Sequence, residues 1–364
     1  MRILVAIEQF YATSRNTSFP PNRSMQTQVV SAILLVTKED DTMGYIDEVS
    51  KELYSYLPSL TKQDDFDEFW ETSIREAKEV PLDPRRDRID YPARHARVYE
   101  ISYYGMDETR IHGWLIIPAF TQKEKYPCLI HYHGFNGSRG KPSEHMHWVM
   151  MGMAVLSVDC RDQGGRTGNN ASYSHGYSVN VASKGVHNKW EYYYRYAYMD
   201  ALKAIDFACA QEDIDASKIV IEGGSQGGAL GTAVSALDDR PVLSMVDVPS
   251  NSNIVCRIEG NHGAFEAVAE YLKKHPEQTD LVMDNLSYFD TMNLADRITC
   301  RVLASVGLKD ETCPPQMYFA TYNRITSSKD IIIYPFNGHE GGGAGQTEIK
   351  LNYLQQHFPD WFEE

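Results

Sequence analysis

Long apolar runs are missing from this chain of 364 residues. Every uninterrupted apolar stretch falls well short of the roughly twenty residues that a membrane-spanning helix needs. The first apolar run, from Ile3 to Ile7, is broken by Glu8, which is too early for the core of a secretory signal. We therefore expect no transmembrane segment, a cytoplasmic location and soluble substrates.

The chain also has few positively charged residues relative to negatively charged ones. The chain has 35 Lys and Arg against 50 Asp and Glu, which gives a formal net charge of −15 at pH 7. Binding to nucleic-acid phosphates or to anionic membranes depends on clustered Lys and Arg. We therefore expect neither nucleic acid nor a membrane as a partner, and we interpret the acidic balance as favouring solubility.

Cysteine is sparse, and no Cys-x-x-Cys pair is present. The six cysteines are scattered and lie mostly in apolar segments, which predicts reduced thiols in the core and not disulfides. They are Cys128, Cys160, Cys209, Cys256, Cys300 and Cys313.

Clear metal-binding motifs are missing as well. Two His-x-His pairs occur, His131 with His133 and His145 with His147. Neither pair is followed by Asp or Cys at ligand spacing, and zinc sites usually need three or four protein ligands. We expect no metal and no cofactor.

The most informative segment that is present is a Gly-x-Ser-x-Gly sequence after an apolar run at residues 219 to 221. This pattern is typical of a nucleophile elbow, in which a sharp strand-to-helix turn exposes the serine. Gly223 and Gly227 would leave room for the strained turn and its close packing. Ser225 is the predicted nucleophile, and the backbone N–H of Gln226, at the helix start, is a predicted oxyanion donor.

An acid and a base follow in the order that α/β-hydrolases use, namely Ser, Asp, His. Asp310 follows the buried-strand pattern at 299 to 307, and His339 follows the one at 331 to 338. We predict His339 as the base and Asp310 as the acid that orients it. Asp247 also ends a strand pattern, directly after the nucleophile helix, and is the second candidate for the acid.

The segment His133-Gly134-Phe135 ends another apolar run. We interpret it as the loop after an early strand, which in such hydrolases supplies the second oxyanion N–H. Phe135 would donate through its backbone, so its side chain need not be polar.

These motifs together resemble carbohydrate esterase family seven, which contains acetyl xylan esterases and cephalosporin C deacetylases. The similarity runs from about Tyr45 to the C-terminus. The family's H-G-Y, R-G-Q, G-x-S-Q-G and H-E motifs correspond here to His133-Gly134-Phe135, Arg161-Asp162-Gln163, Gly223 to Gly227, and His339-Glu340.

The resemblance implies the same site residues: Ser225, His339 and Asp310 as catalytic triad, with the N–H groups of Phe135 and Gln226 as oxyanion hole. It also implies a serine esterase that removes acetyl groups from short xylo-oligosaccharides and cephalosporin C through an acetyl-enzyme, without a cofactor. Polymeric xylan would be out of reach of a cytoplasmic enzyme. Relatives commonly form ring-shaped homohexamers, so the resemblance implies a homo-oligomer.

The chain departs from the family pattern at three places. Asp162 replaces a glycine, which a left-handed conformation would allow because Asp visits that region more readily than most residues. Phe135 replaces a tyrosine and so removes a phenol that could contact substrate. Residues 250 to 253 are small and polar where relatives have a large apolar residue, which predicts a wider and wetter pocket at Ser250.

The predicted fold is α/β: an α/β-hydrolase with a mostly parallel central sheet flanked by helices. Strands are expected near residues 97–104, 110–117, 127–133, 153–159, 218–222, 243–247, 299–306 and 330–336. Residues 43–364 would form one domain, whose part from 43 to 100 is a helical and strand extension at subunit contacts. The apolar positions between Ile46 and Leu60 in this extension predict an amphipathic helix. Instead of contacting another subunit, this helix could form a lid over the active site or belong to the core of the same domain.

Residues 1–42 have no counterpart in the resemblance. We expect a non-native extension, with the natural chain beginning at Met43, and a disordered tail is the alternative.

Two other functions compete with the esterase. A peptidase of the prolyl oligopeptidase kind would use the same triad, although the N-terminal propeller of that group is missing. A catalytically silent binding protein would not need an intact Ser225, Asp310 and His339.

Overall fold

The computed structural model describes residues 44–121 and 123–363. The predictions about residues 1–42 therefore lie outside the described part of the chain. Nine strands form one sheet in the order β1-β2-β3-β5-β4-β6-β7-β8-β9. The first three pairs in this order, up to β3 with β5, are antiparallel. All the later pairs, from β5 with β4 to β8 with β9, are parallel. The strands are β1 (Arg85–Arg88), β2 (Ala96–Tyr104), β3 (Arg110–Pro118), β4 (Tyr126–Tyr132), β5 (Ala154–Val158), β6 (Ile214–Gly224), β7 (Pro241–Asp247), β8 (Arg301–Gly307) and β9 (Lys329–Tyr334).

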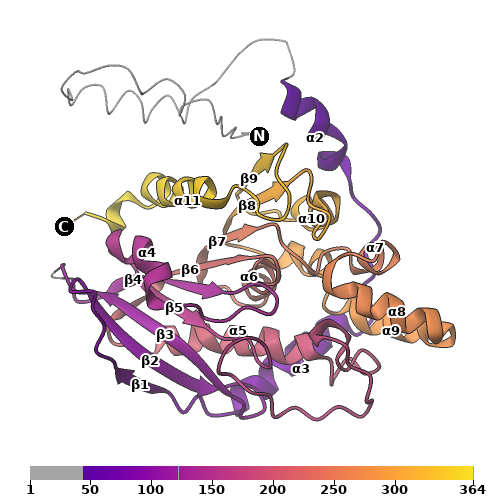
Figure 1. Cartoon of the computed structure of the whole chain (residues 1–364), viewed down its shortest axis with the longest axis horizontal. Helices are drawn as coiled ribbons and strands as arrows, with labels where there is room; N and C mark the ends of the chain where they lie inside the picture. Colours follow the sequence, from indigo (N-terminus) through magenta and orange to yellow (C-terminus); the bar gives the residue numbers. More distant parts are fainter. Residues whose placement is uncertain (1–43, 122, 364) are drawn as a thin grey trace.

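Helices cover both faces of this sheet (Figure 1). Because successive strand side chains point to opposite faces, Ile130 of β4 joins the core beneath α3, α5 and α6, while its neighbour Leu129 joins the core beneath α4 and α11. The helices are α2 (Tyr45–Ser55), α3 (Phe66–Glu79), α4 (Met146–Met150), α5 (Tyr193–Cys209), α6 (Gln226–Leu237), α7 (Ile254–Glu259), α8 (Glu266–Lys274), α9 (Thr279–Ser287), α10 (Pro315–Tyr322) and α11 (Gly343–His357). The architecture is the α/β sandwich that the sequence predicts.

The eight predicted strands are all present, and β1 is an additional strand that the sequence pattern does not predict. Its four residues, Arg85 to Arg88, are all charged and mostly exposed. No apolar alternation marks such a strand. It forms at the edge of the sheet by antiparallel pairing with β2, where charged side chains are well tolerated.

The N-terminal helix is shorter than predicted. The apolar spacing continues to Leu57 and Leu60, but α2 ends at Ser55 and Tyr56 is extended, with ψ of 108°. Pro58 explains the difference, because a proline disfavours helical backbone at the preceding residue and cannot itself donate an N–H.

The next helix, α3, belongs to the core of the same chain. Phe66, Phe69 and Trp70 are buried, and the indole N–H of Trp70 donates to the carbonyl of Tyr288 at 3.2 Å. Thus α3 is a core helix. On and after α2 several apolar side chains stay exposed, namely Tyr45, Val49, Leu57 and Leu60, and subunit contact through them stays a prediction.

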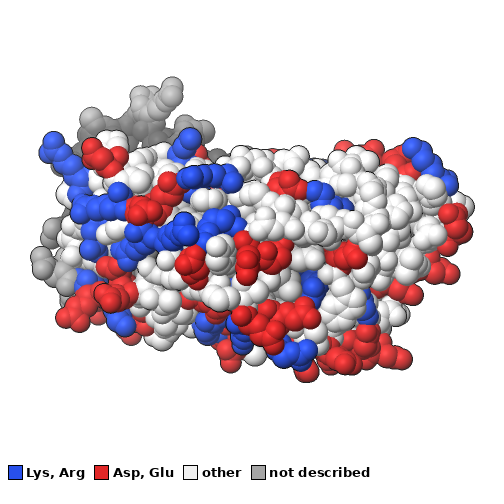
Figure 2. All heavy atoms as spheres, turned by 90° about the horizontal axis from the view of Figure 1, so that it is seen from below, with Lys and Arg blue, Asp and Glu red and all other residues white. Residues whose placement is uncertain are grey.

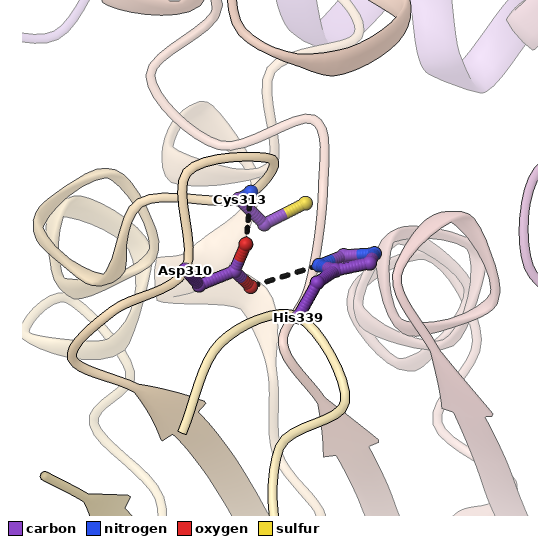
Figure 3. Close-up of side chains that lie close together, drawn as sticks. All are labelled: Asp310, Cys313 and His339. Atoms are coloured by element: carbon purple, nitrogen blue, oxygen red, sulfur yellow. Dashed lines mark hydrogen bonds and ion pairs between the residues drawn. The ribbon is translucent and has the colours of Figure 1, made fainter. Parts of the chain in front are cut away.

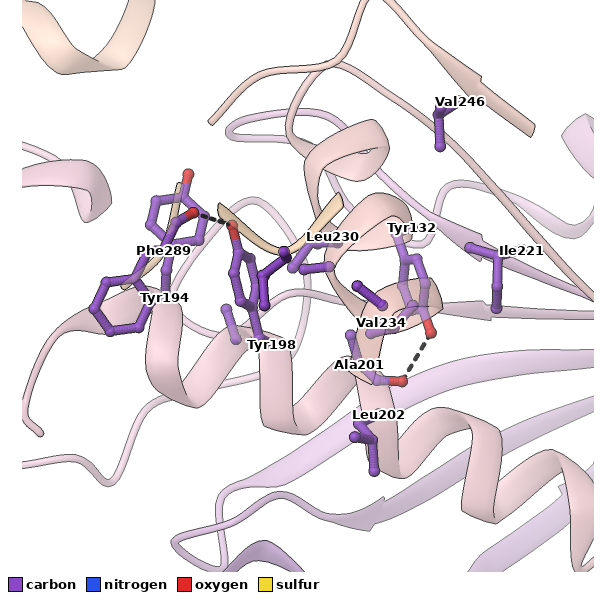
Figure 4. Close-up of a cluster of buried hydrophobic side chains, with 14 of the residues drawn as sticks. Tyr132, Tyr194, Tyr198, Ala201, Leu202, Ile221, Leu230, Val234, Val246 and Phe289 are labelled. Atoms are coloured by element: carbon purple, nitrogen blue, oxygen red, sulfur yellow. Dashed lines mark hydrogen bonds between the residues drawn. The ribbon is translucent and has the colours of Figure 1, made fainter. Parts of the chain in front are cut away.

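Side chains of helices α5 and α6 pack around Tyr132 at the end of β4 (Figure 4). The hydroxyl of Tyr132, the last residue of β4, donates to the carbonyl of Ala201 on α5 at 2.7 Å. Leu230 and Val234 of α6 pack in the same cluster. This packing fixes the strand end from which the next loop departs.

Charges of both signs are interspersed on the face seen in Figure 2, although basic side chains gather toward one end. Ion pairs of the described residues include Arg86 with Asp213 at 2.6 Å, and Arg139 with Glu100 at 2.9 Å. In the described residues no helix is long and apolar enough to cross a membrane. All six cysteines are unpaired, and four are buried.

Candidate active site

Ser225 occupies a sharp turn between β6 and α6. Its backbone has φ 57° and ψ −118°, a left-handed conformation that costs a non-glycine residue free energy. The turn is held on both sides, because the N–H of Ser225 donates to the carbonyl of Asp247 at 2.9 Å and its own carbonyl accepts from Ser250 at 3.0 Å. The strained elbow that the sequence predicts is therefore present.

The glycines of this motif are required by close packing. A Cβ on Gly227 would overlap the carbonyl oxygen of Tyr132, and one on Gly223 would lie 2.7 Å from that same oxygen. The end of β4 thus packs directly against the turn. Larger residues at either position would push the strand and helix apart.

Ser225, His339 and Asp310 form one hydrogen-bonded chain. The Nε2 atom of His339 lies 3.0 Å from Ser225 Oγ, and its Nδ1 lies 2.8 Å from Asp310 Oδ2. The Asp310 side chain is fully buried, whereas that of His339 is 35% exposed. Such a chain lets the imidazole accept a proton from serine while the carboxylate stabilises the resulting cation.

The second oxygen of Asp310 is fixed by its own loop. Asp310 Oδ1 accepts the backbone N–H of Thr312 at 2.9 Å and of Cys313 at 2.8 Å. Only Oδ2 is therefore left for His339 (Figure 3).

Asp247, the competing acid, is engaged elsewhere. Its Oδ1 accepts from Ser305 Oγ at 2.7 Å and from Gln346 Nε2 at 2.9 Å, and its other oxygen pairs with Lys350. Lys350 of α11 also pairs with Glu222 at 2.6 Å. Burial opposes charging of Glu222, but Lys350 and His131 hold the pKa of this carboxyl well below its usual range. Asp247 thus anchors α11 to the sheet.

The loop after β4 lies beside the nucleophile. A Cβ on Gly134 would be 3.9 Å from Ser225 Cβ. His133 shapes this loop: its Nε2 accepts the N–H of Cys160 at 2.8 Å, which leaves Nδ1–H to donate to the carbonyl of Gly134 at 2.7 Å. Burial lowers the pKa of His133, which favours this neutral tautomer. Phe135 follows, at the position predicted for an oxyanion donor.

Gln163 joins the two segments predicted to form the oxyanion hole. Its Oε1 accepts the N–H of Asn136 at 2.7 Å, next to Phe135 in the chain. Its amide also contacts the side chain of Gln226 at 3.0 Å and donates to Tyr193 Oη at 2.8 Å. Gln226 begins α6, so its backbone N–H is one of those that lack a partner within the helix. The side chain of Gln163 therefore fixes the distance between the loop after β4 and the start of α6.

The other motif residues support loops and do not touch the serine. Arg161 is buried between Asp107 and Asp200, with contacts of 2.8 and 2.6 Å, and so anchors the segment that carries Gln163. The carboxylate of Glu340 accepts the N–H of Gly338 at 3.1 Å, which shapes the turn around His339.

Electrostatics favour the charged form of the imidazole. The hydrogen bond to Asp310, and then the one to Cys313, raise the pKa of His339 to about 10. Burial opposes ionisation of the Cys313 thiol, but Arg257 and His339 lower its pKa below the ordinary value.

The departures from the family pattern have visible consequences. Asp162 has φ 57°, the left-handed conformation expected for it, and its carboxylate pairs with Lys184. The Oγ of Ser250 lies 3.0 Å from Asn251 Oδ1. The width of the pocket predicted at Ser250 stays a prediction.

The histidine pairs do not form a metal site within the described ranges. His131 pairs with Glu222 at 2.5 Å, His133 holds the loop after β4, and His145 bonds to the carbonyl of Arg139 at 3.2 Å. The three-ligand group that the structure does bring together is Asp310, Cys313 and His339.

Sequence reasoning missed the contributions of Cys313 and Lys350. Cys313 follows Asp310 by three residues and precedes two prolines, which could have marked a tight loop around the acid. Lys350 carries no such signal, because it lies in a polar stretch more than 100 residues from its partners Glu222 and Asp247.

A mostly parallel sheet with a serine on the turn after β6, an acid after β8 and a histidine after β9 is the arrangement of an α/β-hydrolase. A family model described as "Acetyl xylan esterase (AXE1)" matches residues 43–357. The chain belongs to this acetyl xylan esterase family, and it is a carboxylic ester hydrolase that acts on acetyl esters.

Individual relatives agree with this assignment. The chain is similar to a solved acetyl xylan esterase from Paenibacillus sp. R4, with 37% identity, a TM-score of 0.81, and coverage of 84% of this chain and 98% of that one. Acetyl xylan esterase 1 from Thermoanaerobacterium sp. JW/SL YS485 is 28% identical, with a TM-score of 0.77 and coverage of 83% and 96%. Acetyl esterase Axe7A of Xylanibacter ruminicola is 26% identical over 308 residues, which are 82% of this chain and 67% of that protein.

Proposed function

We propose that this enzyme is a serine esterase that removes acetyl groups from short acetylated xylo-oligosaccharides and from related small esters such as cephalosporin C. The observation that carries the proposal is the continuous hydrogen-bonded chain from Ser225 Oγ through His339 to Asp310. The family and the names of the relatives support an acetylated xylan fragment as the substrate class.

In the proposed reaction His339 Nε2 takes the proton of Ser225 as Oγ attacks the acetyl carbonyl carbon. The N–H groups of Gln226 and Phe135 stabilise the oxyanion, each donor contributing roughly 3 kcal/mol. His339 then gives its proton to the ester oxygen of the sugar as the bond from that oxygen to the acetyl carbon breaks. The sugar leaves as an alcohol, and an acetyl-enzyme remains. Water repeats the sequence, releases acetate and restores Ser225.

The test is product release from three substrates by the purified protein. We expect acetate from acetylated xylo-oligosaccharide and from cephalosporin C, and no amine from a proline amide. Amine without acetate would establish a peptidase instead, and no product from any of them would contradict the proposed substrates. Labelling of Ser225 by an organophosphate would separate an active enzyme with another substrate from a silent one.

The pH dependence of the reaction should reflect the charge of His339. A protonated imidazole cannot accept the serine proton, and the raised pKa of His339 keeps it protonated to higher pH than an ordinary histidine. We therefore expect kcat/KM to rise with pH, with a midpoint well above about 6.5, the ordinary histidine value.

Initial rates over about pH 5 to 10.5 measure that midpoint. The same linkage predicts that the stabilising contribution of protonated His339 is fully present below about pH 6.5 and is lost as pH rises through its folded value. A profile that reaches its plateau below pH 6.5 would contradict the prediction.

A further inference from the structure

The acid end of the triad contains a third ligand-type side chain, Cys313. Its backbone N–H donates to Asp310 Oδ1 at 2.8 Å, and its sulfur points toward the ring of His339 (Figure 3). One donor atom from each of Asp310, Cys313 and His339 lies within 4.8 Å of the other two. Among the residues that the structure describes, no other His, Cys, Asp or Glu side chains form such a group of three.

The three donors suit a thiophilic divalent cation. Thiolate, imidazole and carboxylate are the ligands that bind Zn²⁺, at about 2.0 to 2.3 Å in tetrahedral geometry, which places the donor atoms about 3.3 to 3.8 Å apart. Because Asp310 Oδ2 and His339 Nδ1 are 2.8 Å apart, these two atoms would move slightly apart on binding. The 4.8 Å limit on the distances within the group means that any donor that must approach moves by only a modest amount. A fourth position can be taken by water, as in open zinc sites.

The loop that carries Asp310 and Cys313 is held in place by hydrogen bonds, whereas the loop that carries His339 can adjust. Asp310 is fixed by the N–H groups of Thr312 and Cys313. The buried Arg257 donates to the carbonyl of Thr312 at 3.2 Å, which anchors the loop from the other side. His339 lies between Gly338 and the left-handed Gly341, so its loop can follow the metal, and its 35% exposure provides an entry path.

We propose that Asp310 Oδ2, Cys313 Sγ and His339 Nδ1 bind a cation such as Zn²⁺, and that the bound cation inhibits the esterase. Binding displaces the thiol proton to solvent. A charged imidazole also loses its Nδ1 proton to solvent and keeps the one on Nε2, whereas in a neutral imidazole the proton moves from Nδ1 to Nε2. The Nε2 atom then presents an N–H to Ser225 and can no longer accept the serine proton. The inhibition rests on the proposed function, whereas the binding does not.

Binding is tested with Co²⁺ alone, whose complexes with thiolates absorb in the near ultraviolet. We expect this charge-transfer band in the wild type, in Ser225→Ala and in Cys209→Ser, a matched control on α5 whose cysteine lies outside the group. Cys313→Ser should lose the band, and Zn²⁺ should abolish it in the others. A missing band in the wild type, or a band that persists in Cys313→Ser, would overturn the site. Ser225→Ala makes this result independent of turnover.

Inhibition is tested by titrating Zn²⁺ into assays of the wild type, Cys209→Ser and Cys313→Ser, each relative to its own uninhibited rate. The inhibition constant should rise at least about tenfold in Cys313→Ser only, because weakening even a residue that supports a metal ligand costs roughly 10- to 100-fold in affinity. Equal inhibition of all three proteins would refute the proposed link.

Should Cys313→Ser fail to fold, X-ray absorption of Zn²⁺-loaded Ser225→Ala decides the point. We expect one sulfur at about 2.3 Å together with nitrogen and oxygen at about 2.0 to 2.2 Å. A shell of nitrogen and oxygen alone would exclude Cys313 as a ligand.

Discussion

Ser225→Ala is expected to lower kcat for acetate release by roughly a millionfold, the loss measured when the serine of a comparable triad is removed. The physical reason is that no other hydroxyl occupies the strained turn, where Oγ lies 3.0 Å from His339 Nε2. The residual rate would come from the oxyanion hole and from substrate binding. Single-turnover and steady-state acetate release, with a sensitive coupled assay, measure the difference.

Ser235→Ala is the matched control for this experiment. Ser235 lies on α6, the helix that follows Ser225, and is buried, but it has no contact with His339 or Asp310 in the hydrogen-bonded chain. We expect it to keep its rate within a few-fold, and we expect both variants to unfold near the wild-type temperature. A Ser225→Ala enzyme that retained more than a hundredth of the activity would rule out Ser225 as the nucleophile.

The sequence was sufficient to predict where eight of the nine strands lie along the chain, and which loops carry the candidate site residues. A buried parallel strand leaves a run of apolar residues, and the active site of such a sheet lies where these runs end. Ser225, Asp310 and His339 each follow such a run, so their approximate positions could be predicted. The glycines on both sides of Ser225 added the local geometry.

Other parts of the site depend on contacts between distant segments. Asp247 and Asp310 both follow strands, so the pattern alone could not say which carboxylate faces His339. The structure separates them because Lys350 and Gln346 of α11 engage Asp247. In the same way, nothing in the spacing shows that Gln163 reaches across to Asn136.

Local signals also explain the errors at the N-terminal end. The helical spacing of apolar residues continued past the point where Pro58 stops the helix, so the predicted helix was too long. The strand β1 has charged residues only and forms because β2 offers an edge. Periodicity detects elements that bury one face and says little about elements that exist through backbone pairing alone.

The choice between the two carboxylates leads to a second large effect, in Asp310→Asn. We expect kcat/KM to fall by about 10⁴-fold, as when the acid of a measured triad is changed to its amide. Because the N–H groups of Thr312 and Cys313 need an acceptor, the new amide must keep its oxygen toward them and turn its NH₂ toward His339. Nδ1 then becomes the acceptor, the proton moves to Nε2, and His339 can no longer take the proton of Ser225.

Asp247→Asn is the matched variant, and it should affect stability more than rate. Lys350 would lose one of its two carboxylate partners and keep Glu222 at 2.6 Å, so we expect a loss of about 1.5 to 3 kcal/mol in the free energy of unfolding. Its kcat/KM should stay within about tenfold of the wild type, since the carboxylate does not reach His339. Urea unfolding and acetate release on the two variants measure both quantities. Equal loss of activity in Asp247→Asn and Asp310→Asn would reject Asp310 as the orienting acid. Only Asp310 bonds to Nδ1 of His339, so equal losses would mean that this bond is not what the reaction depends on.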